Sequence, residues 1–361
     1  MAKVGYVGYS KDLKHPADRR RVASWAEESE IELEIVNPIE SEVLILSNSA
    51  NFSYWMKRAS QPIVLDLVDG YLGEYPNFVR DFLRNVIRTL RGTSSFHWLT
   101  YTKHLRWACE HSNAVIVASH EQRNEVLKYN SNVHVILDNF SEFDIPLSKK
   151  LGNQENDQDP TLGNRIFWEG FGYTLKHFRI VASELDLFLR DNDFRMSLVT
   201  VLNFPRWGGY LGNVRTQSVV QKLFPLSWQR IEIVPWSIEN ILKHVEISQF
   251  AIIPVDKRDK FASMKSENKL LSMWYLGIPT LFSSIPSYAR VANACDESTF
   301  CISNEKWGDG LIRIHLETLV RPKISTKVST YLQESHTKKV LSDRWSAAIA
   351  SSMGPEKPSC G

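Results

Sequence analysis

Short, almost uninterrupted runs of apolar residues recur along this chain, and segments with a helical pattern separate them. In the first half the runs lie at residues 3–9, 31–36, 42–46, 62–68, 114–119 and 133–137. Strands that are buried on both faces have this pattern, and they occur mainly in parallel sheets with helices on each side. The pattern therefore predicts an α/β fold built on a parallel sheet.

A polar segment at residues 148–165 interrupts the alternation and holds almost nothing that a core can bury. The alternation then resumes, with strands expected at residues 165–168, 195–201, 231–234, 250–255 and 280–283. A chain of 361 residues is also too long for one ordinary core. We expect two Rossmann-like domains, residues 1–150 and 164–325, whose parallel sheets face a cleft. The helical tail, residues 326–361, either stays on the second domain or crosses back to pack on the first.

The composition gives the chain no overall attraction to nucleic acid, because the net charge is only +2 and no nucleic-acid-binding motif is visible. The four cysteines are scattered, with no CxxC pair and no zinc-binding spacing, which is typical of free thiols in a reducing compartment. No apolar signal region opens the sequence, and no run approaches the ~18 apolar residues of a membrane-spanning helix. We therefore expect a cytoplasmic protein.

Three segments together resemble a known family. The longest, Ile231 to Ser284, reads as a strand, a short helix, a buried strand ending in proline, a polar loop, a lysine-bearing helix start, and a helix closed by Gly-Ile-Pro before a strand. The other two segments are residues 113–144 and residues 168–178. Together the three segments resemble the GT-B glycosyltransferases of the family 4-like group (glycosyl transferases group 1). In this resemblance, residues 113–144 correspond to the end of the acceptor domain, and residues 168–178 correspond to the loop that opens the donor domain. The resemblance covers most of the chain.

The resemblance implies a glycosyltransferase that binds a nucleotide-sugar donor on its second domain and retains the anomeric configuration. The implied acceptor is a glycan, a lipid-linked sugar or a small molecule. Many members carry two glutamates, eight residues apart, of which the first lies close to the sugar and the second holds the ribose. Here the corresponding positions are Met264 and Ser272, with Glu267 one turn away as a substitute. Two alternatives stay open: a nucleotide-sugar epimerase, which this fold also hosts, and a non-catalytic scaffold or glycan-binding subunit.

Ligands of doubly wound sheets bind at the carboxyl ends of the strands. This rule selects Asp69, His120 and Glu169 as candidate catalytic residues, with Asp66 as a weaker one. Asp69 either acts as a base on an acceptor hydroxyl or closes a turn before Gly70. His120 either contacts acceptor or phosphate or is a polar residue near a helix cap, and Glu169 is otherwise an ordinary loop acid.

The candidate donor-binding residues follow strands of the second domain. They are Gly170, Lys176, Trp236, Lys265, Glu267, Asn268 and Lys269. Gly170 allows a ligand to approach the backbone closely, and the ring of Trp236 either stacks on a nucleobase or packs in the core.

Breaking the bond of a nucleotide sugar places negative charge on the leaving diphosphate, which a metal or fixed cations must stabilise. No DxD signature in a metal-binding context is present, so we expect no metal and no cofactor besides the nucleotide sugar as co-substrate. Lys265 and Lys269, with the N–H groups of a helix capped by Ser266, would form an anion site. The other interpretation is a solvated helix start rich in lysine.

A basic helix in the first half suggests a further partner. Arg80, Arg84, Arg88 and Arg91 are spaced so that they share one helix face. Residues 77–107 hold six Lys or Arg and one Asp, with several aromatic residues. Such a helix either rests on an anionic membrane, at the inner face where lipid-linked acceptors are found, or is a solvated arginine face on a normally packed helix.

Overall fold

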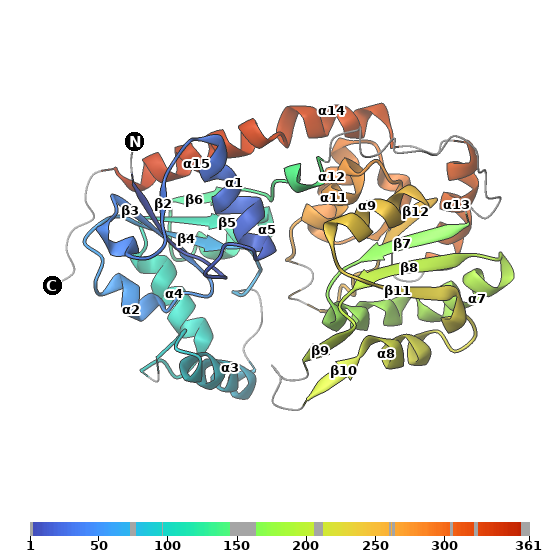
Figure 1. The fold of residues 1–361 in the computed structure, drawn as a ribbon, viewed down its shortest axis with the longest axis horizontal. Coiled ribbons are helices and arrows are strands. Elements are labelled where there is room, and N and C mark those ends of the chain that lie inside the picture. The colour runs from blue at the N-terminus through green and yellow to red at the C-terminus, as the bar shows by residue number, and fades with distance from the viewer. Residues whose placement is uncertain are drawn as a thin grey trace. The chain divides into compact units, whose positions relative to one another are not determined.

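The computed structural model describes residues 3–72, 77–95, 97–144, 164–205, 212–259, 261, 264–303, 306–320 and 324–354. The expected linker at residues 148–165 lies almost wholly outside them. The chain forms two compact units (Figure 1). The first comprises Met1–Ser141, Lys260–Ser266 and Gln333–Gly361, and the second comprises Glu142–Asp259 and Glu267–Leu332.

The first unit is built on a six-stranded parallel sheet with the strand order β2-β1-β3-β4-β5-β6. The strands are β1 (Val4–Val7), β2 (Leu33–Glu34), β3 (Val43–Ser47), β4 (Ile63–Leu67), β5 (Ala114–Val117) and β6 (Val133–Val135). Every residue of β3, β4 and β5 is buried. The runs predicted at residues 42–46, 62–68 and 114–119 are confirmed as strands covered on both faces. The run predicted at residues 31–36 forms only the short β2, whose residues are half-buried.

Helices cover both faces of this sheet. They are a π-helical turn (Asp18–Ala23) that continues as α1 (Ser24–Glu28), then α2 (Phe52–Met56), α3 (Phe78–Leu90), α4 (Tyr101–His111), α5 (His120–Val126) and α15 (Lys338–Ser352). Figure 1 shows α2 and α4 on one face and α1 with α15 on the other. The rings of Trp25 and Trp345 stack with centroids 5.7 Å apart, and Trp25 Nε1 donates to Ser346 Oγ at 3.1 Å. The last helix of the tail therefore crosses back to the first unit.

The second unit holds another six-stranded parallel sheet, with the order β11-β8-β7-β12-β13-β14. The strands are β7 (Arg165–Glu169), β8 (Arg195–Thr200), β11 (Ile231–Pro235), β12 (Phe250–Ile253), β13 (Thr280–Ser283) and β14 (Cys301–Ile302). Counted along the chain this order is 3-2-1-4-5-6, the order of a Rossmann sheet. A short antiparallel hairpin, β9 (Asn203–Pro205) and β10 (Asn213–Arg215), accompanies it.

Helices accompany this sheet along the chain of the second unit. They are a 3₁₀ segment (Gly172–Ile180), α7 (Ala182–Asp191), α8 (Thr216–Leu223), α9 (Ile238–Glu246), α11 (Asn268–Tyr275), α12 (Pro286–Ala294) and α13 (Trp307–Val320), while α14 (Thr326–Ser335) spans the unit boundary. Ser237 caps α9 by accepting from the N–H of Asn240 at 3.0 Å. Gly277, at φ +79°, ends α11 in a left-handed conformation that glycine adopts without strain. The expected cap at Ser266 is wrong, because Glu267 precedes α11 and its side chain makes no capping bond.

One of the four arginines predicted on a shared face of α3 does not point outward, which corrects that part of the sequence interpretation. Arg88 points into the unit: its Nη2 donates to the carbonyl of Asn48 at 2.6 Å and its guanidinium lies 4.2 Å from the ring centroid of Tyr101. Arg84 lies 5.8 Å from the same ring, whereas Arg80 and Arg91 are exposed. Among the described residues, no helix combines the length and the apolar content that spanning a membrane requires.

The histidine between α14 and α15 makes the first unit sensitive to acid. His336 is buried, its Nε2 donates to the carbonyl of Asp138 at 2.9 Å, and its ring stacks on Phe140. Burial lowers the pKa of His336 to about 4, with Arg344 adding to the effect and the bond to Asp138 opposing it. The unfolded chain, with an ordinary histidine pKa of about 6.5, therefore takes up the proton first. The contribution of the neutral histidine to the free energy of unfolding is therefore complete above about pH 6.5, and it is lost as the pH falls toward 4.

Replacing His336 with Gln is accordingly expected to reduce the pH dependence of unfolding. At pH 5 the buried neutral histidine should cost about 2 kcal/mol relative to pH 7, and His336→Gln should remove that loss. Urea unfolding at pH 7 and pH 5 measures it. His97→Gln is the matched control, because His97 is exposed and should leave the difference unchanged. An equal loss in wild type and His336→Gln would contradict the assignment.

Candidate functional site

The carboxyl ends of β7 and β12 meet at the switch point of the second sheet, where ligands of Rossmann sheets bind. Glu169 is the last residue of β7 and is half-buried. Gly170 follows it at φ +156°, and its N–H donates to the carbonyl of Val199 at 3.1 Å. The sequence prediction of Glu169 and Gly170 therefore falls at the point of the sheet where a ligand is expected.

Lys269 reaches this switch point from the first turn of α11. Its Nζ lies 4.6 Å from the ring centroid of Trp168, close enough for a cation–π attraction. A Cβ atom at Gly170 would come within 2.7 Å of that Nζ and 2.9 Å of the Trp168 ring. Glycine at position 170 is thus what allows the ammonium group to lie against the end of β7. The N–H groups at the N-terminus of α11 add partial positive charge at this switch point.

Glu267 is buried just before α11 and binds a partner that the sequence did not reveal. Arg290 of α12 donates from Nη2 to both carboxylate oxygens, at 3.1 and 3.2 Å. Burial raises the pKa of Tyr288, and the charges of Glu267 and Glu169 raise it further. An arginine, a tyrosine and two glutamates therefore surround the base of the switch point.

Three other predicted donor-binding residues also lie in the second unit. Lys176 forms an ion pair with Asp259, with Nζ 2.5 Å from Oδ2, and so ties the first loop of the unit to the loop after β12. Trp236 follows β11 and is half-buried. Strand β11 is two strands away from β7, a separation of roughly 10 Å between the two strands. Asn268 opens α11 and is half-buried.

Two exposed aromatic rings beside Gly170 were missed in the sequence. Phe171 and Tyr173 are 51% and 54% exposed, and their rings stack with centroids 5.7 Å apart. Gly172 between them packs against Phe204 of β9, leaving no room for a Cβ. Exposed rings of this kind offer a flat surface to a sugar or a base. Their signal in the sequence was the spacing Phe-Gly-Tyr directly after the strand.

The two lysines that were predicted to act together belong to different units. Lys269 is part of the second unit, whereas Lys265 belongs to the first, where its Nζ lies 5.8 Å from the ring centroid of Phe261. The residues at the two expected glutamate positions make local hydrogen bonds. The hydroxyl of Ser272 donates to the carbonyl of Lys269 at 2.8 Å, and the carbonyl of Met264 accepts from Ser119 Oγ at 3.0 Å.

Asp69 lies in the first unit beside a small cavity. Burial raises its pKa, while Lys265 and a hydrogen bond from Tyr71 act to lower it. The cavity, of about 10 Å³, has room for roughly one water molecule, and its lining includes Asp69, Gly70, Gln122 and Met264. His120 is the exposed first residue of α5, and Ser119 is the residue that caps this helix.

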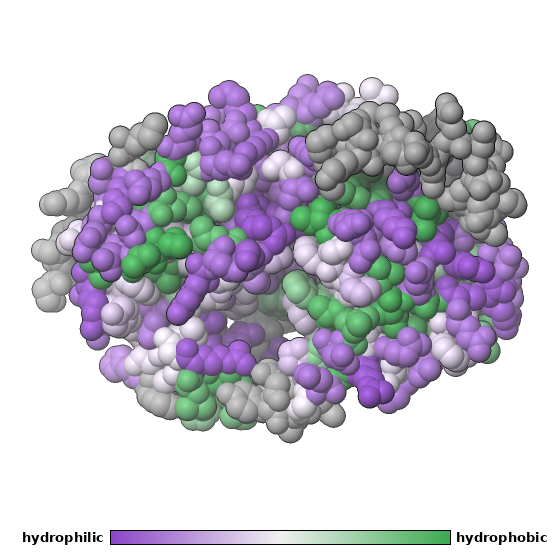
Figure 2. Space-filling model, in the orientation of Figure 1, coloured by the Kyte–Doolittle hydropathy of each residue, from purple (hydrophilic) through white to green (hydrophobic). Residues whose placement is uncertain are grey.

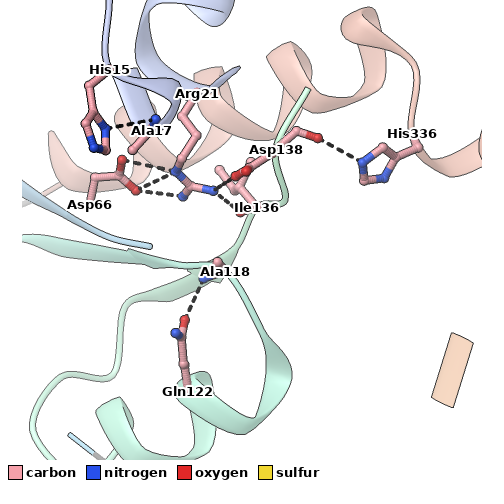
Figure 3. Close-up of polar contacts among 9 residues, drawn as sticks. All are labelled: His15, Ala17, Arg21, Asp66, Ala118, Gln122, Ile136, Asp138 and His336. Carbon is pink, nitrogen blue, oxygen red and sulfur yellow. Dashed lines mark hydrogen bonds and ion pairs between the residues drawn. The ribbon is translucent and has the colours of Figure 1, made fainter. Parts of the chain in front are cut away.

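Asp66 is not accessible to a ligand, which corrects its sequence interpretation. Its carboxylate is fully buried and accepts from Arg21 Nη2 at 2.6 Å and from Arg21 Nε at 3.0 Å (Figure 3). Arg21 Nη1 also donates to the carbonyl of Ile136 at 2.7 Å and lies 3.3 Å from Asp138 Oδ1. Asp66 is therefore part of a buried network that joins the first helix to the ends of β4 and β6.

The end of β1 in the first unit is occupied by a carboxylate of the protein itself. Asp18 is fully buried and accepts from the hydroxyl of Tyr6 and the N–H of Tyr9, at 2.6 and 2.8 Å. Its other oxygen accepts from the N–H and the hydroxyl of Ser10, both at 2.9 Å. Backbone N–H groups that would receive a phosphate in a nucleotide-binding sheet already bind an anion.

No family model matches the chain, and no curated protein matches it in sequence. Solved structures do match. A glycosyltransferase from Rickettsia africae ESF-5 is 11% identical, with a TM-score of 0.59 over 98% of this chain and 99% of that one. An alpha-glucosyltransferase solved with UDP and DNA is 9% identical, with a TM-score of 0.59 over 96% and 99%. TarM is 9% identical, with a TM-score of 0.57 over 85% of this chain, which spans about half (54%) of TarM. The chain therefore has the fold of the GT-B glycosyltransferases.

Proposed function

We propose that this chain is a glycosyltransferase that binds a nucleotide-sugar donor on its second unit. The observation that carries the proposal is the switch point of a Rossmann-ordered sheet, where Lys269 and the start of α11 lie against Gly170. The fold is that of known glycosyltransferases, two of which were solved with UDP. A uridine nucleotide is therefore the first donor class to test.

The leaving diphosphate would be stabilised by fixed positive charge rather than by a metal. In this proposal Lys269, the amide of Asn268 and the N–H groups of α11 bind the phosphates. Trp236 and the stacked rings of Phe171 and Tyr173 are the surfaces offered to base and sugar. Lys176 and Glu267 position the surrounding loops, through Asp259 and Arg290 respectively.

The acceptor would be prepared by residues of the first unit. A carboxyl whose pKa is raised by burial is suited to take a proton, and Asp69 has this property. Lys265 beside it and the exposed His120 would bind acceptor or phosphate groups. We propose a glycan, a lipid-linked sugar or a small molecule as the acceptor, retention of configuration, and a cytoplasmic protein that works at the inner membrane face.

A non-catalytic scaffold or glycan-binding subunit is the second candidate. Neither expected glutamate is present, since Met264 and Ser272 occupy the two positions. Calorimetry with nucleoside diphosphates separates the two functions, because a scaffold without a donor site binds none of them. An epimerase would bind the donor but release a changed sugar without any acceptor.

Lys269→Ala is expected to reduce donor hydrolysis or transfer by about 100-fold, because a cation at the leaving group is lost. It should also abolish the rise in melting temperature that UDP gives to the wild type. Lys222→Ala, at an exposed position on α8 of the same unit, is the matched control and should behave like the wild type. Full activity of Lys269→Ala would remove the diphosphate role assigned to this residue.

A further inference from the structure

Helix α3 is turned with its polar side toward the protein. Asp81 and Asn85 are its buried residues, with 5% and 2% exposed. The carboxylate of Asp81 accepts from the N–H of Thr102 at the start of α4, at 3.1 and 3.2 Å. Asn85 donates to the carbonyl of Ser95 at 3.2 Å and accepts from the hydroxyl of Ser94 at 2.6 Å. These bonds fix which side of the helix faces inward.

The apolar side chains of α3 therefore face outward. The α3 apolar face consists of Phe78, Val79, Phe82, Leu83 and Leu90, which are 60%, 63%, 40%, 42% and 67% exposed. Figure 2 shows hydrophobic side chains gathered over α3, and Figure 1 shows α3 lying beyond α4 from the sheet. A soluble helix normally buries this stripe. An apolar helix face left outward marks a surface that another apolar medium or molecule covers.

The border of the α3 apolar face is positively charged. Arg80, Arg84 and Arg91 are spaced by four and seven residues and so lie along one edge of it. Residues 77–107 contain six Lys or Arg and a single acidic residue, Asp81, which is buried. Apart from the buried Asp81, every charged side chain of α3 and of its C-cap Arg91 is an arginine.

We propose that α3 lies in the headgroup region of an anionic bilayer, with the α3 apolar face inserted and its arginines at the lipid phosphates. A helix with an apolar face and a basic border is suited to this position. A second copy of the chain fits less well, because a symmetric contact would bring two arginine borders together. The role of this membrane contact rests on the proposed function: the first unit, which carries Asp69, would meet a lipid-linked acceptor at the membrane.

Vesicle flotation of the full chain tests the proposal. Vesicles of phosphatidylcholine with about 30% phosphatidylglycerol should bind the wild type at least ~10-fold more tightly than pure phosphatidylcholine, and 0.5 M salt should weaken the binding. Leu83→Glu with Leu90→Glu should reduce binding at least ~10-fold, and Arg80→Glu with Arg91→Glu should do the same.

The chain offers a matched control on α13. Leu316 and Leu319 are 56% and 63% exposed, but Arg313 and Glu317 give their surroundings mixed charge. Leu316→Glu with Leu319→Glu should bind vesicles like the wild type. The proposal is overturned if the wild type does not bind, if the α13 variant loses binding equally, or if the α3 variants change only the oligomeric state in gel filtration. The melting shift given by UDP, measured on the same samples, separates failure of this surface from failure of the proposed donor site.

Discussion

Replacing Asp66 with asparagine is expected to destabilise the first unit by about 3–5 kcal/mol. The variant keeps the shape of the side chain but removes the charge that lies 2.6 Å from Arg21 Nη2. Arg21 is fully buried and, among the residues that the structure describes, would keep Asp138, at 3.3 Å, as its remaining ion-pair partner. A buried cation with so little compensation costs far more than a surface ion pair contributes.

Urea unfolding of Asp66→Asn measures this effect, with Asp343→Asn as the control. Asp343 is exposed on α15 of the same unit and pairs with Lys339 only at 3.7 Å, so its replacement should change stability by less than about 0.5 kcal/mol. The double variant Arg21→Met with Asp66→Leu should recover part of the loss, because no charge is then left buried without a partner. A change below about 1 kcal/mol in Asp66→Asn would show that the pair contributes little.

Trp345→Ala is expected to cost about 3–5 kcal/mol, because it leaves a large cavity between α15 and α1. Trp345 is 1% exposed, stacks on Trp25 and lies with its ring centroid 5.6 Å from the guanidinium of Arg21. The destabilisation by Trp345→Ala and that by Asp66→Asn should not be additive, since both residues contact Arg21.

Hydrogen exchange places this effect in the molecule. Trp345→Ala should lower the protection of amides in β4 and β5, strands of the sheet that α15 covers, and leave the second unit unchanged. Trp307→Ala is the reciprocal variant, because Trp307 is fully buried in the core of the second unit. Equal loss of protection in both units for either variant would contradict the division into units that fold around separate cores.

The strands were predictable because their signal is local. Runs such as Val43–Ser47 and Ile63–Leu67 are buried at every position and apolar at all of them except Ser47 and Asp66. The side of α3 that faces inward was not predictable in the same way. Periodicity shows that a helix has two unlike faces, but the buried bonds of Asp81 and Asn85 decide which one turns inward.

The candidate site was predictable only in part for a similar reason. The rule that ligands bind at strand ends located Glu169 and Gly170, because it needs nothing beyond the order of elements. Contacts between residues far apart in sequence gave no local signal. The approach of Lys269 to Trp168 and the pairing of Glu267 with Arg290 are of this kind. Asp66 was misread because its partner, Arg21, precedes it by 45 residues.

The return of α15 to the first unit sets an order of events during synthesis. Gln333 follows Ser141 by about 190 residues, and a ribosome adding 5–20 residues per second needs roughly 10–40 s for that stretch. For this time the nascent first half lacks α15, which together with α1 covers one face of its sheet. During synthesis the nascent chain therefore exposes apolar surface that can bind wrong partners, and its first half completes folding only after its second half has been made.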